Sequence, residues 1–467
     1  MIKAAERLSI AVAIASAIFA FLHVPLIFGG QWAGDEWAQF FRLHEYGWGW
    51  FWLRLIEWSP RPLSESTLAG YYFLQSTFRA PMIEVFLGLL WAFLAGCIFI
   101  AAPSRRDHPD ARALTLFVIA SLFLGHGIFN AFLWPMSAAA YVLALAGVVG
   151  FFLLGLFGGE PETAYPRILC GAFLVVAATA AECGAFFVIS IGALLALRGP
   201  RPIARNAWYF VPFAIAVGIV VLGLTFRVSH TPAGAGGPYL LNIWTSFAGA
   251  IRDLPLRLLS LDDASVDLDP ATAILVRILL FGGALLVFQA NPLLAASRDF
   301  RARVTLALVG TIFLISLSSY YAYGVPGGSA HETFQQCLSV FAVIGAASVV
   351  PPILEERWRG VGLAALIMAL AIGVATRLPE LRVDYALIGD IRQSIAASWA
   401  SGQAPGTTGM IFVAAPDGRL LASVPPPIGH FSLSSPGVRW DVDAIMRFFG
   451  KSTIDVVQFD RPAKAPR

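Results

Sequence analysis

Two adjacent carboxylates, Asp35 and Glu36, are the residues of this chain best suited to chemistry. They stand in the sequence Gly-Asp-Glu-Trp, shortly after the first long apolar segment, 8–27. A carboxylate that takes the proton of an attacking hydroxyl acts as a general base. Lys3 and Arg7 precede the apolar segment, and basic residues favour the cytoplasmic side of a membrane. We therefore expect the acidic pair on the opposite side.

The composition is that of a membrane protein. Hydrophobic residues make up 58% of the 467 residues and charged residues 13%, with a mean hydropathy of +0.72, which is too apolar for a soluble chain of this length. The 32 basic and 29 acidic residues nearly balance, so no nucleic-acid partner is expected. The four cysteines lie singly, which indicates neither a disulfide scaffold nor a zinc site.

The elements that position the acidic pair are apolar runs of membrane-spanning length. They predict an all-α polytopic membrane protein with about eleven transmembrane helices. Since further spans follow the first segment, we interpret it as an uncleaved signal-anchor, with a cleaved signal peptide as the alternative. The runs lie at 8–27, 82–102, 112–128, 136–157, 168–181, 184–197, 207–225, 271–290, 304–320, 334–352 and 360–376.

Basic residues predict the orientation of these spans. The short loops around 129–135 and 321–333 carry no Lys or Arg, whereas loops on the N-terminal side carry clusters of them, as expected of cytoplasmic loops. We expect a cytoplasmic N-terminus and an extracytoplasmic C-terminus. The excess of Arg over Lys suggests a bacterial genome, and hence the bacterial inner membrane. The clusters are Arg105, Arg106 and Arg112; Arg167; Arg198, Arg201 and Arg205; Arg298, Arg301 and Arg303; and Arg357 and Arg359.

The segment 168–197 allows two interpretations. It is interrupted only by Ala181-Glu182-Cys183-Gly184. We interpret it as two short spans that meet at Glu182 on the outer side, which leaves the following arginines in the cytoplasm. One long tilted helix is the alternative, and it would invert every later loop.

Beyond the spans, the chain divides into a transmembrane part, 1–376, and a C-terminal extracytoplasmic part, 377–467. Strand-like runs at 409–413 and 454–457 predict a small mixed α/β domain in the second part. The transmembrane part contains two long external loops, 28–81 and 226–270.

Loop 28–81 is rich in both aromatic and charged residues. Aromatic rings with a polar edge favour the headgroup level, so short helices parallel to the membrane are expected here. Asp35 would then lie at the boundary between lipid and water. Alternatively, the acids only solvate a loop that tryptophans anchor. Further polar residues and one tryptophan fall at the same membrane face: His126, Asn130, Trp134, Glu182, His331 and Glu332.

The sequence lacks both a Walker A motif and a dinucleotide-binding glycine fingerprint. An active site at the outer face would also have no access to cytoplasmic nucleotide sugars. A sugar carried on polyprenyl phosphate meets the requirement for a lipid-borne activated donor. Its transfer needs a base for the acceptor hydroxyl and cationic or hydrogen-bonding groups for the departing phosphate.

The chain resembles integral-membrane glycosyltransferases of the GT-C superfamily, which carry an acidic motif in a large first external loop. The Asp-Glu pair is similar to that of protein O-mannosyltransferases and lipid A aminoarabinose transferases. Bacterial proteins related to O-antigen glucosyltransferases are similar in further short motifs. These are Trp58-Ser59-Pro60-Arg61-Pro62-Leu63, Phe132-Leu133-Trp134-Pro135 and Val438-Arg439-Trp440-Asp441-Val442-Asp443.

The resemblance implies that Asp35 is the general base and that Glu36 orients it or contacts the sugar. It also implies a substrate role for Arg61, although Pro60 stands where the related proteins have glycine. Alternatively, Arg61 contacts lipid headgroups or pairs with Glu57 or Glu65.

Three more arginines are candidates for binding the donor phosphate. Arg277 lies inside an apolar span, where a charge is costly and faces a cavity or a partner; alternatively, it snorkels to the interface. The resemblance implies that loop 226–270 helps to hold the donor, which makes Arg252 and Arg257 candidates. Contacts with anionic headgroups are the alternative for both.

The remaining polar candidates each have a structural alternative. Glu182 is a second acidic group near the acceptor or a residue that caps a helix end. His126 and His331 contact phosphate or form interfacial hydrogen bonds. Glu332 stands beside His331, so a divalent cation is conceivable, but no spacing specifies a metal site or any other cofactor.

We therefore expect an inverting glycosyltransferase with a polyprenyl-phosphate sugar donor and an extracytoplasmic glycan or glycolipid acceptor. A transporter or flippase for such lipids is one alternative, but it would concentrate ionisable residues near the bilayer midplane. A polysaccharide polymerase or ligase is another, for which a late external loop rich in arginine is expected.

Overall fold

The structure is a computed structural model of the whole chain. It describes residues 2–32, 34–57, 59–102, 109–123, 128–197, 203–230, 243–259, 270–290, 297–324, 327, 329–351, 354–421, 426–434 and 438–460. Helices dominate this part of the chain, and three short strands lie near the C-terminus.

All the regular elements described in the first half of the chain are helices. Its elements are α1 (Ile2–His23), η1 (Val24–Gly29), α2 (Gly34–Tyr46), α3 (Trp48–Glu57), α4 (Pro62–Phe78), α5 (Ile83–Ala101), α6 (Pro109–Ser121), η2 (Phe129–Leu133), α7 (Pro135–Gly158), α8 (Ala164–Ala180), α9 (Glu182–Ala196) and α10 (Ile203–His230).

The second half adds the longest helix and the strands. Its elements are α11 (Ile243–Leu259), α12 (Pro270–Ala290), α13 (Arg298–Tyr323), α14 (Ser329–Val349), η4 (Glu356–Trp358), α15 (Arg359–Gln403), β1 (Gly409–Ala414), β2 (Gly429–Ser432), α16 (Trp440–Phe449) and β3 (Thr453–Gln458).

Seven helical segments in the described part of the chain are long and apolar enough to cross a membrane. This confirms a mainly helical chain with the character of a multi-pass membrane protein. The segments are Ala5–Gly29, Ile83–Ala101, Pro135–Gly158, Asn206–Thr225, Pro270–Gln289, Arg298–Ala322 and Arg359–Gln403.

Four of the expected spans are not among these seven. The run 112–128 begins in α6, which has 13 residues, and α8 and α9 have 17 and 15 residues. Helix α14 is long enough at 21 residues, but glutamines, serines and an ion-pairing glutamate make it polar. The number of crossings therefore stays a prediction.

The segment 168–197 forms two helices. Ala181 adopts an extended conformation with φ −154° and ψ 156° between α8 and α9. Gly184 approaches α8 so closely that an added Cβ would lie 2.1 Å from the Ala177 carbonyl oxygen. A single continuous helix is therefore excluded, and Glu182 stands at the junction.

Helix α7 forms the centre of the helical core. Nearly all of its side chains are buried, and it packs against α5 and α8. At Gly147 an added Cβ would lie 2.5 Å from the Phe173 carbonyl oxygen. Small residues allow membrane helices to approach this closely, so α7 holds its neighbours in fixed positions.

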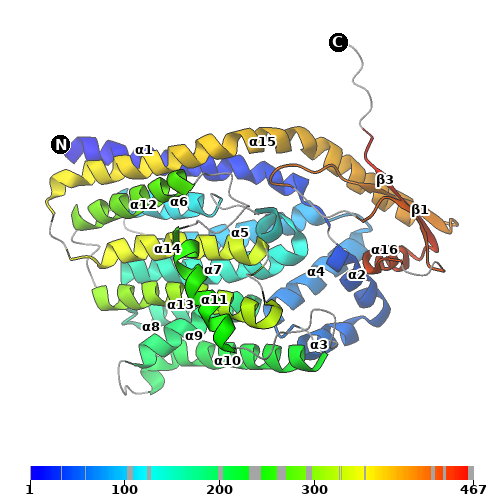
Figure 1. Cartoon of the computed structure of the whole chain (residues 1–467), viewed down its shortest axis with the longest axis horizontal. Coiled ribbons are helices and arrows are strands. Elements are labelled where there is room, and N and C mark those ends of the chain that lie inside the picture. The colour runs from blue at the N-terminus through cyan, green and yellow to red at the C-terminus, as the bar shows by residue number, and fades with distance from the viewer. Residues whose placement is uncertain are drawn as a thin grey trace, which may run out of the picture.

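Helix α15 connects the two ends of the molecule (Figure 1). It lies beside α1 and continues to the C-terminal strands, so the expected boundary at residue 377 falls inside a helix. The strand-like runs at 409–413 and 454–457 form β1 and β3. These strands pair in parallel, and β2 pairs antiparallel with β3.

The strands and α16 lie at the same end of the molecule as α2, α3 and α4 (Figure 1). Helix α16 packs against α2, and β1 packs against α15. The centre of this contact is aromatic: Trp37 has ring centroids 5.5 Å from Phe448 and 5.6 Å from Phe449. Helix α2 is thus packed against segments from near the C-terminus.

Candidate functional site

The acidic pair lies in the first turn of α2. Consecutive positions on a helix point in different directions, and here they separate the two carboxylates. Asp35 is exposed, whereas Glu36 is 1% exposed. Both profit from the partial positive charge of the helix N-terminus. Asp35 is therefore the member of the pair that a reactant can reach.

Glu36 is tied to the start of α7. Trp134 donates a hydrogen bond from Nε1 to Glu36 Oε2, at 2.9 Å. Trp134 adopts an extended conformation before Pro135, the first residue of α7. Trp91 of α5 donates to the carbonyl oxygen of Phe132 at 3.1 Å. These bonds fix the orientation of Glu36, and hence that of the helical turn that carries Asp35.

Asp35 has an electrostatic environment suited to a base. Although it keeps an exposed surface, surrounding protein displaces enough water for burial to raise the pKa of its carboxyl. The nearby Arg54 opposes this shift in the pKa, and the negative charge of Asp441 adds to it. A raised pKa makes a carboxylate a stronger proton acceptor near neutral pH.

The two charges that act on Asp35 are themselves paired. Arg54 donates to Glu65 at 2.5 Å, and their side chains are 6% and 5% exposed. Asp441, at the start of α16, is 2% exposed and accepts a hydrogen bond from Nε of Arg439 at 2.6 Å. The site therefore combines residues from α2, α3, α4 and α16.

Arg61 pairs with Glu182, with 3.1 Å between Nε and the carboxylate. Their side chains are 21% and 19% exposed. Burial acts to lower the pKa of Arg61, but the charges of Glu182 and Glu65 outweigh it, and the pKa is raised. Glu182 is thus the ion-pair partner of Arg61 among the described side chains, and Glu65 acts on Arg61 through its charge. The side chain of Glu57, the other sequence alternative, lies outside the described residues.

The turn around Pro60 places Arg61 just before α4. The Arg61 N–H donates to the carbonyl oxygen of Ser59 at 2.7 Å, and the Arg61 carbonyl accepts from Glu65 N–H at 3.0 Å. Pro62 then occupies the start of the helix, where a missing N–H is tolerated. Proline at position 60 is thus compatible with a defined turn and a half-buried Arg61.

A second polar group involves α11 and α14. Arg257 is 3% exposed and lies 3.5 Å from Glu332. The neighbouring His331 forms an edge contact with the ring of Tyr141, with centroids 5.5 Å apart. Tyr141 also contributes to the electrostatic environment of Arg61. Tyr141 on α7 therefore connects the Arg61 group with the His331 group.

The other two arginine candidates are placed differently. Arg252 has a side chain that is 72% exposed and pairs with Asp253 at 3.1 Å; Tyr320 donates to the same carboxylate at 2.5 Å. Arg277 is 9% exposed and donates to Ser339 of α14 at 2.8 Å. Arg277 is thus bonded within the packing of α12 against α14.

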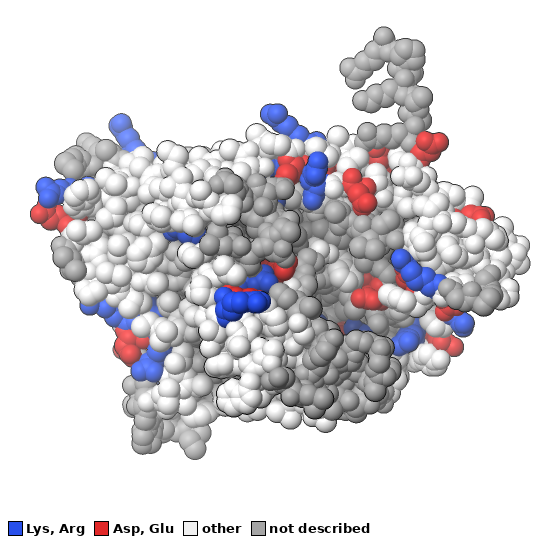
Figure 2. Space-filling view, viewed as in Figure 1, with Lys and Arg blue, Asp and Glu red and all other residues white. Residues whose placement is uncertain are grey.

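Charged side chains are confined to a few places on the face in Figure 2. They lie near the two ends, along the upper edge and in one group at the centre, with uncharged surface between these places. A recess lies beside the central group. Large uncharged areas between the charged groups are typical of a membrane protein.

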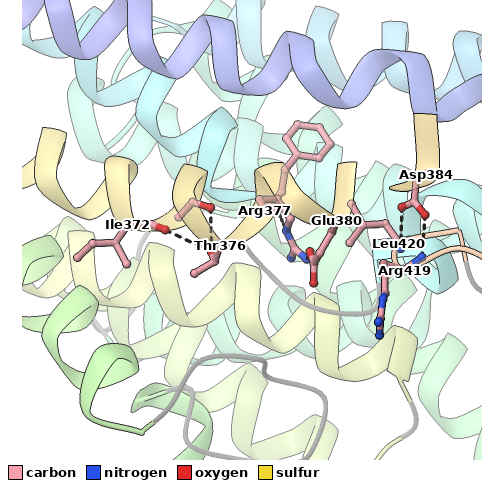
Figure 3. A network of polar contacts seen from close by, with 9 residues as sticks. Ile372, Thr376, Arg377, Glu380, Asp384, Arg419 and Leu420 are labelled. Atoms are coloured by element: carbon pink, nitrogen blue, oxygen red, sulfur yellow. Dashed lines mark hydrogen bonds and ion pairs between the residues drawn. The ribbon is translucent and has the colours of Figure 1, made fainter. Parts of the chain in front are cut away.

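The C-terminal segment supports the start of α2 through Asp384 (Figure 3). From α15, the Asp384 carboxylate accepts hydrogen bonds from the N–H groups of Arg419 and Leu420, both at 2.7 Å. The next carbonyl, that of Leu421, accepts from Gln31 Nε2 at 3.1 Å. Asp384 therefore binds the loop around Arg419 and Leu420, and this loop in turn binds Gln31, just before α2.

Several residues of the site did not stand out in the sequence. Arg54 and Glu65 belong to no recognisable sequence motif, and Tyr141 stands in an apolar run. For α16, the only signal in the sequence was the short motif that contains Arg439 and Asp441. Asn130 lies half-buried in η2, which ends just before Trp134. His126 lies outside the described residues.

Within the described residues, no group of three or more His, Cys, Asp and Glu side chains could hold a metal ion.

Comparisons with models of known protein families, with curated proteins and with solved structures give no match for this chain.

Proposed function

We propose that this protein is an inverting membrane glycosyltransferase of GT-C type. It moves a sugar from a polyprenyl-phosphate donor to an extracytoplasmic glycan or glycolipid acceptor, with Asp35 as the general base. The observation that carries the proposal is the split acidic pair, in which Asp35 is exposed and has a raised pKa while Glu36 is buried and held by Trp134. Arg54 lies near enough for its charge to act on Asp35.

The proposed reaction is a single displacement. The acceptor hydroxyl gives its proton to Asp35 as its oxygen bonds to the anomeric carbon. The bond from that carbon to the phosphate oxygen breaks at the same time, and polyprenyl phosphate leaves with the bonding electrons. Arg61 is the first candidate to stabilise the negative charge on the leaving phosphate. Arg61, which pairs with Glu182 at 3.1 Å, would then bind the donor phosphate in place of Glu182 or together with it.

Arg257 is the second candidate for the phosphate. It is buried beside Glu332, and Tyr141 connects this region with Arg61. Arg252 is exposed, which suits a contact with lipid headgroups better. Arg277, bound to Ser339, is assigned to packing between α12 and α14.

The finer topology belongs to the same proposal. Helices α6, α8, α9 and α14 add four crossings to the seven candidate spans, and the hairpin of α8 and α9 crosses twice. The N-terminus then lies in the cytoplasm. The end of α15, the three strands and α16 form a small extracytoplasmic domain above the inner membrane of a bacterium, and α2 to α4 lie beneath it.

Analysis of cell-envelope glycans tests the proposal. Glycans from cells that lack the protein are compared by mass spectrometry with those from cells complemented with the wild type, with Asp35→Asn or with Glu45→Gln. Glu45 is a matched control, an exposed carboxylate on the same helix. We expect one sugar to disappear without the protein and to return with the wild type and Glu45→Gln, but not with Asp35→Asn.

Two results would contradict the proposal. Full restoration of the sugar by Asp35→Asn would remove the base assignment. Movement of a lipid-linked sugar across liposomes that contain the purified protein, with no acceptor modified, would indicate a transporter or flippase instead.

A further inference from the structure

A long apolar groove lies between two candidate spans. Helices α1 and α5 form its walls, α6 forms its floor, and its volume is about 1320 Å³. Small residues on the walls keep it open, and they include Ala17, Ala20, Gly88, Ala92 and Ala95. Among its lining residues only Glu84 and Arg112 are charged.

The length of the groove matches the thickness of a bilayer core. On α5 its lining residues run from Glu84 to Ala102, which corresponds to roughly 28 Å of helix at 1.5 Å per residue. A typical hydrocarbon core is about 30 Å thick. Water in such a groove would find few polar partners, and an empty groove would lose dispersion contacts along its walls. A hydrocarbon chain is the occupant that fits.

The two ends of the groove differ in charge. At one end, Glu84 is paired with Arg392 at 2.6 Å, and Arg392 also lies over the ring of Phe28. At the other end, Arg112 is exposed, and it has no hydrogen-bond or ion-pair partner among the described residues. An unpaired cation at the mouth of an apolar groove complements an anionic headgroup.

The Arg112 end is also the end far from Asp35. Arg112 follows Asp110, which accepts a hydrogen bond from Ser9 near the start of α1, whereas α2 follows the other end of α1. A headgroup bound to Arg112 therefore lies across the helices from the acidic pair. It cannot be the sugar phosphate that Asp35 would serve.

We infer that the groove between α1 and α5 is a binding site for an anionic phospholipid, with acyl chains along Gly88 and Ala92 and the headgroup phosphate on Arg112. The lipid lies against α6, whose Arg112, Thr115 and Ile119 line the groove. It would join α1 to α5 from outside the protein, and its binding does not depend on the proposed enzymatic activity.

Photocrosslinking tests this site in the full-length protein. The protein is placed in phosphatidylcholine nanodiscs that contain a small share of phosphatidylglycerol with a diazirine on its acyl chain. After illumination, labelled peptides are identified by mass spectrometry. We expect labels on α5 and α6, and a lower yield with the same diazirine on phosphatidylcholine.

Two glycines of α5 form a matched pair of variants. An added Cβ meets no atom within 4 Å at either Gly88 or Gly96, but only Gly88 lines the groove. Gly88→Trp should reduce the yield of labelling several-fold, and Gly96→Trp should leave it unchanged. Ala92→Phe provides a second, smaller obstruction if Gly88→Trp does not fold. Arg112→Gln should reduce the phosphatidylglycerol yield to that of phosphatidylcholine.

Three results would overturn the inference. One is equal labelling of the wild type and both groove variants. Another is equal labelling by the two phospholipids in the wild type. The third is displacement of the phosphatidylglycerol probe by polyprenyl phosphate in both the wild type and Arg112→Gln, which would assign the groove to the donor lipid.

Discussion

The two ends of the molecule use carboxylates in different ways. At the end with α6, Asp110 is completely buried; Ser9 of α1 donates to it, and Arg359 at the start of α15 pairs with it at 2.7 Å. At the other end, Asp35 remains exposed, and neighbouring charges act on its pKa in opposite directions. The first carboxylate fastens three helices together. The second is left accessible with a perturbed pKa, which is the combination expected at a functional site.

The largest effect should come from Asp35→Asn. Because an amide cannot accept the proton, we expect the transfer rate to fall by about 100-fold to 10,000-fold, with no loss of thermal stability. Transfer assays with purified protein and lipid-linked donor measure the first quantity, and thermal melting in detergent measures the second. If the variant lost stability and activity in parallel, Asp35 would have a structural role like that of Asp110.

The converse result is expected for Asp110→Ala. Removing one partner of a buried pair leaves Arg359 uncompensated, which costs about 3–5 kcal/mol. The free energy of unfolding should fall, while the activity of the remaining folded protein should change little. The double variant Asp110→Leu with Arg359→Met is the control, because it removes both charges and should recover much of the loss.

A smaller effect is expected for Trp134→Phe. This change removes the indole N–H that Glu36 accepts at 2.9 Å. A buried group that loses its partner costs about 1–3 kcal/mol. We expect a reduced kcat with a nearly unchanged KM, because Glu36 positions the turn of Asp35 and does not bind substrate in this scheme. A change confined to KM would place Glu36 or Trp134 in contact with the sugar.

The smallest effect should be a shift along the pH axis in Asp441→Asn. The rate requires ionised Asp35, so activity is lost as the pH falls through the raised pKa of this carboxyl. Asp441 contributes to raising that pKa; its removal lowers the pKa and moves the acid limb of the rate profile to lower pH. Asp443→Asn on the same helix, where Asp443 pairs with Arg447, should leave the acid limb in place.

Local features of the fold were predictable because they depend on neighbouring residues. The apolar runs at 82–102 and 136–157 coincide with α5 and α7, and the interruption at Ala181 separates α8 from α9. The continuation of α15 across Pro379 was not predictable from propensity, since a proline inside a helix removes a hydrogen bond. There α15 is held by packing and by Arg377, which donates to the Phe123 carbonyl at 3.2 Å (Figure 3).

Most of the candidate site depends on pairs that are distant in sequence. Glu36 and Trp134 are separated by 98 residues, and Arg61 meets Glu182 from another part of the chain. Residue type indicated that these side chains were unusual for their surroundings. It did not identify their partners, because the partner of a charge is decided by how the helices pack. Asp35 needed no distant partner to be recognised, and for this reason it stood out first.

The length of helix α15 bears on how far Asp35 lies from the membrane-spanning segments. Its 45 residues correspond to roughly 68 Å, about twice the thickness of a hydrocarbon core. A helix of this length extends beyond the hydrocarbon core. One part of α15 packs among the spans, and its C-terminal part packs against β1. Asp384 of α15 binds the loop whose Leu421 bonds Gln31 before α2, and α16 packs against α2. The distance of Asp35 from the spans is therefore fixed through a continuous helix.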